Sequence, residues 1–84
     1  MTVARDVLKQ WVIDALQRSG GEAHLISVAR DIWTHHESDL REAGDLFFSW
    51  QYDMRWACTA LRSEGVVEPA SKSGVWTLAI AANT

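Results

Sequence analysis

The sequence predicts an α+β domain in which three main helices precede a β-hairpin. First, apolar residues from Trp56 to Leu61 recur at helical spacing, so that they share one buried stripe. Second, Gly65 lies where this helix should end, because glycine readily adopts the left-handed conformation that closes a helix. Third, two β-branched or aromatic segments, 66–67 and 75–78, flank a polar turn at 69–74. A helix that runs directly into such a hairpin is typical of a winged helix-turn-helix with a small antiparallel sheet.

The first helix and the strand after it follow from apolar spacing and glycines. Thr2 is a suitable N-cap for a helix that starts at Val3, and its apolar stripe continues to about Arg18. The Gly20–Gly21 pair should stop this helix. A short strand is expected at 23–25, as a third member of the sheet that the wing forms.

The second and third helices are marked in the same way. Ser27 should cap a helix that runs to about His36, and residues 38–43 should add one more helical turn before Gly44. The last helix is expected to begin near Ser49 and to span about 49–64, with Phe47 and Phe48 as an apolar plug in front of it. The wing then spans 66–78.

Length and composition predict one domain, 1–84, with a single core. Its five tryptophans compensate for small size, because each indole buries a large apolar area. A single cysteine excludes an internal disulfide and a cysteine-rich zinc site. The sequence contains neither a run of 18 apolar residues nor an apolar leader, so we expect no membrane association and a cytoplasmic location.

Charge is unevenly distributed along the chain. The net charge is −3, whereas DNA-binding domains are usually basic. The excess acid lies in the middle segment, where residues 21–47 carry two basic and six acidic groups, while residues 48–84 carry three of each. The last helix and the wing are therefore locally neutral. Few phosphate contacts are available, so any affinity for DNA should be modest and sensitive to salt.

Several short motifs in the second half of the chain point to a known family: Trp56-Ala57, Thr59, Leu61, Gly65-Val66-Val67 and the closing Gly74-Val75-Trp76-Thr77-Leu78. Through them residues 54–78, and more loosely 3–78, resemble the winged-helix domain at the N-terminus of Mrr-type restriction proteins. In that family the domain binds DNA and a separate domain cleaves it. This chain departs from the family pattern at Cys58, where a basic residue is common, and at Ser63-Glu64, where the helix end is usually more basic. The resemblance implies a winged-helix fold and a DNA-binding role.

The candidate DNA contacts follow from the expectation that the core is faced by Tyr52, Trp56, Ala60 and Leu61. Gln51 would then pair with adenine, Arg55 with guanine, and Thr59 with a base edge. Phosphates would be bound by Arg62, by the wing tip and by the start of the helix. The predicted set is Ser49, Trp50, Gln51, Arg55, Cys58, Thr59, Arg62, Ser71, Lys72 and Ser73. The sequence thus predicts a domain that binds double-stranded DNA, as a small transcription regulator or as the targeting module of a larger system.

Alternatives stay open for several of these residues. Arg55 and Arg62 could be solvated or paired with Asp53 or Glu64, and Trp50 could be a core tryptophan. In another class of function, the acidic segment 37–45 or the last helix would dock a protein partner. The oligomeric state also stays open, and a homodimer is one possibility, because the sequence contains no heptad seam or dimer helix from which symmetry could be predicted.

An enzyme or a metal protein is not expected. The sequence contains no glycine-rich phosphate loop, nucleophile elbow or paired-carboxylate motif. His35 and Asp39 have the i, i+4 spacing of metal ligands but lack a third ligand, while the adjacent His36 points elsewhere on a helix. We therefore expect no metal and no cofactor.

Overall fold

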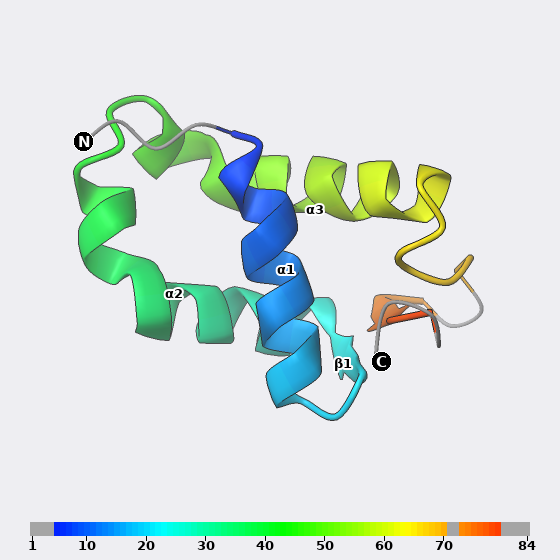
Figure 1. The fold of residues 1–84 in the computed structure, drawn as a ribbon. Coiled ribbons are helices and arrows are strands. Elements are labelled where there is room, and N and C mark those ends of the chain that lie inside the picture. Colours follow the sequence, from blue (N-terminus) through cyan, green and yellow to red (C-terminus); the bar gives the residue numbers. More distant parts are fainter. Residues whose placement is uncertain (1–4, 71–72, 80–84) are drawn as a thin grey trace.

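A computed structural model describes residues 5–70 and 73–79, and it confirms the α+β prediction (Figure 1). The elements are α1 (Val7–Arg18), β1 (Glu22–His24), α2 (Leu25–Arg41), α3 (Leu46–Ser63) and β2 (Val75–Thr77). Helices α1, α2 and α3 pack on one another, and the two strands form a small antiparallel sheet beside them. This layout is consistent with a winged helix.

Glycines end α1 and α3 as the sequence predicts. After α3, Gly65 has a φ of +80°, its N–H donates to the Arg62 carbonyl, and the Val66 N–H donates to the Leu61 carbonyl. This pair of bonds is a Schellman motif, which satisfies carbonyls that would otherwise lack partners. The same pair follows α1, where the N–H groups of Gly20 and Gly21 donate to Gln17 and Leu16. The predicted return of Val66 onto the core is confirmed, because its side chain packs against the buried cluster.

Helix α2 is longer than predicted at its start and interrupted where the sequence suggests a break. It begins at Leu25, and His24 is its N-cap, since Nδ1 of His24 accepts a hydrogen bond from the Ile26 N–H. His36 departs from helical geometry, with a φ of −132°, and its ring stacks on Trp11 of α1 at a centroid distance of 3.9 Å. The helical turn expected at 38–43 is the segment after this kink.

Helix α3 begins at Leu46, three residues before the predicted start near Ser49. Gly44 has a φ of +66°, and Asp45 is the N-cap, so the chain turns directly from the end of α2 into α3. Phe47 and Phe48 are therefore helical and do not form a separate plug. The predicted N-cap Thr2 and first helical residue Val3 lie outside the described residues; within them, α1 begins at Val7.

The small sheet joins two distant parts of the chain. Strand β1 pairs antiparallel with β2, with Glu22 opposite Thr77 and His24 opposite Val75. On the other edge of β2, Val67 forms a bridge with Leu78, and the Glu68 N–H donates to the Thr77 carbonyl at 2.7 Å. The final strand thus lies between β1 and the segment after Gly65. The strand predicted at 66–67 is reduced to this isolated bridge, so the sheet has two strands. The strand expected at 23–25 is present as β1, with its bounds shifted by one residue.

The core draws on every helix and on the sheet. Leu8 and Leu16 from α1, Ile32 from α2 and Met54 from α3 are almost completely buried, and Trp76 from β2 closes the cluster. In the part of the chain that the structure describes, none of the helices combines the length and hydrophobicity needed to cross a bilayer.

Candidate nucleic-acid interface

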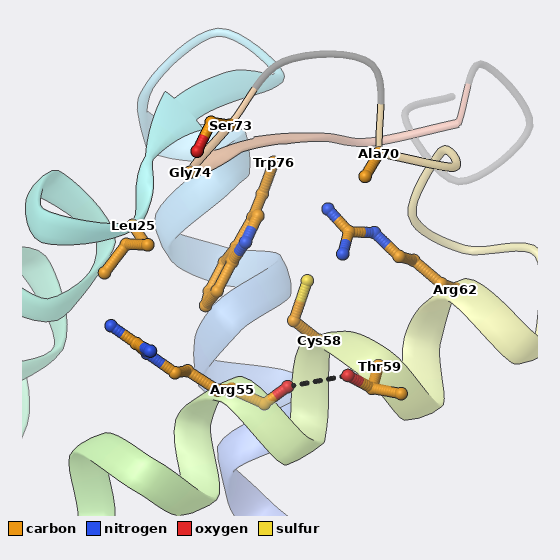
Figure 2. A pocket seen from close by; sticks show the side chains of 9 residues that line it. All are labelled: Leu25, Arg55, Cys58, Thr59, Arg62, Ala70, Ser73, Gly74 and Trp76. Atoms are coloured by element: carbon orange, nitrogen blue, oxygen red, sulfur yellow. Dashed lines mark hydrogen bonds between the residues drawn. The ribbon is translucent and has the colours of Figure 1, made fainter.

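A surface groove of about 400 Å³ lies between α3 and the wing. Arg55, Thr59 and Arg62 line it from α3, and Ala70, Ser73 and Gly74 line it from the wing loop. Figure 2 shows the guanidinium groups of Arg55 and Arg62 on either side of Cys58, with the Trp76 indole facing them from β2. The lining contains two cations and no carboxylate. The groove is therefore a basic site on an acidic chain.

Arg62 connects the helix to the wing. Its Nε donates to the Glu68 carbonyl at 3.1 Å, which holds the guanidinium near the start of the wing loop. One turn earlier, the Thr59 hydroxyl donates to the Arg55 carbonyl at 3.2 Å and is thereby oriented along the helix (Figure 2). The Arg62 guanidinium is thus positioned by a backbone carbonyl and not by an acidic side chain.

The wing is fixed to the start of α2 through Gly74. The Leu25 N–H donates to the Gly74 carbonyl at 2.8 Å, and a Cβ on Gly74 would lie 2.7 Å from Nε2 of His24. Gly74 also has a φ of +74°, which side chains disfavour. Both the conformation and the close approach of His24 therefore require glycine at this position.

Ion pairs separate the basic residues of the described chain into two groups. Arg5, Lys9, Arg18 and Arg41 pair with Asp53, Glu64, Asp31 and Glu37, respectively. Among the described residues, neither Arg55 nor Arg62 forms an ion pair. Asp53 pairs with Arg5, which precedes α1, and Glu64 pairs with Lys9 of α1, which rules out the alternative in which these carboxylates neutralise the groove.

The predicted orientation of α3 is confirmed at Trp56 and wrong at two other residues. Trp56 packs against the core, and the Arg5 guanidinium lies 3.7 Å from the centroid of its ring. Tyr52, expected in the core, is 74 % exposed, whereas Cys58, expected on the surface, is 1 % exposed. The buried stripe runs through Trp50, Met54, Ala57, Cys58 and Leu61. Helix α3 is thus rotated so that the wing covers Cys58 and leaves Tyr52 in solvent.

Cys58 forms the floor of the groove and remains a neutral group. Burial raises the pKa of its thiol, and the positive charge of Arg62 offsets this effect only in part. A protonated, buried thiol is a poor nucleophile and a poor metal ligand. Its role is packing under Trp76.

The predicted contacts at the start of α3 are not where the sequence analysis expected them. Ser49 and Trp50 follow the first turn, because α3 begins at Leu46, so their N–H groups have intrahelical partners. The Ser49 hydroxyl donates to Asp53 at 2.8 Å, and the Trp50 side chain is 6 % exposed. Trp50 is thus a core tryptophan, which was the alternative to a DNA contact. The set of proposed DNA contacts therefore excludes Ser49, Trp50 and Cys58.

Of the four remaining predicted contacts, the structure describes Gln51 and Ser73. Gln51 is exposed on the same stripe of α3 as Arg55 and Thr59. Ser73 lines the groove, whereas Ser71 and Lys72 lie outside the described residues.

The imidazoles of His35 and His36 each lie close to an oxygen atom of another α2 residue. Nδ1 of His35 lies 2.8 Å from the Asp31 carbonyl oxygen, and Nδ1 of His36 lies 3.6 Å from Asp39 Oδ2, so the expected i, i+4 pair of His35 with Asp39 is replaced by other contacts. The described residues contain no group of three side chains arranged to hold a metal ion.

Sequence analysis missed two exposed aromatic side chains on α3. Phe48 is 85 % exposed and Tyr52 is 74 % exposed, and both lie on the stripe that contains Gln51 and Arg55. The spacing of four residues between Phe48 and Tyr52 was the available signal, because it places them on one face, but the apolar residues all around this helix obscured which face is buried.

Comparison with models of known protein families, with curated proteins and with solved structures finds no match to this chain.

Proposed function

We propose that this chain is a winged-helix domain that binds double-stranded DNA, with α3 in the major groove and the wing on the backbone. The supporting observation is the groove with Arg55 and Arg62, which contains no acidic lining residue although the chain as a whole is acidic. Helix α3 is long enough, at 18 residues, to extend along the major groove, which admits an α-helix. A small transcription regulator or the targeting module of a restriction-like system would both use such a domain.

The two arginines have different parts in this proposal. Arg55 projects from the middle of the exposed stripe, next to Gln51 and Thr59, and is suited to a bidentate contact with guanine. Arg62 is held to the wing by the Glu68 carbonyl, and its remaining N–H groups are suited to a phosphate. Ser73 and, from the sequence alone, Ser71 and Lys72 would add backbone contacts at the wing tip.

The salt dependence of binding tests this assignment. If Arg62 and Lys72 each neutralise one phosphate, the slope of log K against log salt is about −1.8, so the affinity falls roughly tenfold from about 50 mM to about 200 mM salt. Fluorescence anisotropy with a labelled random-sequence duplex measures the slope. No binding at about 100 µM protein in low salt would overturn the proposal, since nonspecific DNA binding falls within this range.

A charge-matched control separates a specific contact from the effect of net charge. Arg62→Ala should reduce the size of the slope by about 1. Arg41→Ala removes the same charge from the end of α2, where Arg41 pairs with Glu37 away from the groove. Equal loss of affinity in both variants would show that the groove is not the contact surface.

A second candidate is a protein-interaction domain, in which the last helix or the acidic segment 37–45 docks a partner. The exposure of Phe48 and Tyr52 favours it, because large exposed aromatic side chains on one helix face are typical of contact surfaces. If the chain binds no DNA duplex, the protein-interaction domain is the function that remains.

A further inference from the structure

A second, more apolar groove of about 660 Å³ lies between α2 and the N-terminal part of α3. Its floor contains Trp33, Phe47 and Trp50, whose rings pack on one another: the centroid of Trp33 lies 6.2 Å from that of Trp50 and 6.4 Å from that of Phe47. Ile26, which is 51 % exposed, lies at its edge. The groove has room for one or two large apolar side chains.

The same face carries an apolar side chain that nothing in the described chain covers. Phe48 follows the groove residue Phe47 on α3, and it touches that ring edge-on at a centroid distance of 5.1 Å. With 85 % of its surface exposed, Phe48 is the most exposed large apolar side chain of the described residues. One face of this chain therefore presents both an aromatic projection and an aromatic groove beside it.

The charges beside these two features have opposite signs. Arg30 lines the groove and forms no ion pair within the described residues. Asp45, one turn before Phe48, is exposed; it makes no side-chain cap bond to α3 and has no cationic partner among the described residues. An aromatic projection next to a carboxylate thus complements an aromatic groove next to a guanidinium.

We infer that this face binds a second copy of the chain, in a two-fold dimer where Phe48 of each protomer enters the α2–α3 groove of the other. A two-fold interface is self-complementary, so it requires both members of each contact on one face of one chain, and this face has them. A small molecule in the groove would leave Phe48 in water, and a different protein would have to supply both the ring and the carboxylate. This surface shares Gln51 with the proposed DNA contacts, but the two proposals are measured separately, because self-association of the chain is tested without DNA.

Sedimentation equilibrium on the purified chain tests the dimer. The weight-average mass should rise with concentration from 9.4 kDa towards twice that value. Phe48→Ala removes the projection, and Thr34→Arg fills the groove from an exposed position on α2; each should weaken the dimer about tenfold or more. Tyr52→Ala, which removes an exposed ring that does not line the groove, should change the dimer constant less than about threefold.

Mixing the two weakened variants distinguishes this arrangement from other modes of association. An equimolar mixture of the Phe48→Ala and Thr34→Arg chains restores one intact contact, so it should associate more strongly than either variant alone. A mixture no better than its components would overturn the inference, as would a wild-type chain that stays at 9.4 kDa up to about 1 mM. Circular dichroism of each variant verifies that folding is retained.

Discussion

Gly74→Ala tests how the wing is fixed to the rest of the domain. Alanine at a φ of +74° costs about 1–2 kcal/mol. Its Cβ would also lie 2.7 Å from Nε2 of His24, so the imidazole must turn away and lose the hydrogen bond from the Ile26 N–H that caps α2. Loss of a cap costs about 1 kcal/mol. The free energy of unfolding should therefore fall by about 2–3 kcal/mol, which lowers the melting temperature by roughly 10–20 °C.

Gly65→Ala is the matched control, because Gly65 has a φ of +80° and no atom within 4 Å of the added Cβ. It should show the conformational cost alone, about 1–2 kcal/mol. In a His24→Ala background, Gly74→Ala should cost about 1 kcal/mol less than in the wild type, because the ring and its cap are already absent. Urea denaturation of the single and double variants measures this coupling. Equal costs at the two glycines, or additive costs in the double variant, would refute the contact between wing and α2.

Three further predictions concern the core, the surface and the thiol. Ile32→Ala, at a fully buried position, should lower the free energy of unfolding by about 2–5 kcal/mol in urea denaturation. Hydrogen bonds from Arg18 lower the pKa of Asp31, so this pair stabilises the fold above pH 4 and its contribution is lost as the pH falls below about 4. Asp31→Asn should therefore cost about 0.5–1 kcal/mol at pH 7 and little near pH 2, as judged by thermal melts. Cys58 should react with a thiol reagent at least about 100-fold more slowly than a free cysteine at pH 8, because the buried thiol has a raised pKa; rapid labelling of the native protein would contradict this packing.

The helix ends and the sheet could be predicted because their signals are local. Gly65 and Gly20 each follow an apolar stripe and close a helix through their own backbone, which no distant residue needs to specify. The strand 75–77 follows from β-branched and aromatic composition after a polar turn. The interruption of α2 at His36 was suggested by the change from an apolar stripe to an acidic segment.

The rotation of α3 could not be predicted, for a physical reason. This helix has apolar residues on every side, among them Phe48, Tyr52, Met54 and Trp56, so its periodicity is compatible with more than one buried face. The choice depends on what packs against it. Trp76 of the wing covers the Cys58 side, α1 covers Trp56, and the Tyr52 side is left without a covering element in the described chain. The early start at Leu46 was missed because Phe47 and Phe48 resemble a core plug.

The pairing of Glu22 with Thr77 has a consequence for how the molecule assembles. These residues are 55 positions apart, so the sheet requires closure of a long loop, whereas each helix forms from neighbours along the chain. We therefore expect the helices to gather first and β2 to dock last. The cleft beside Arg62 then exists only in the finished molecule, and a ligand held there would retard unfolding of the entire domain.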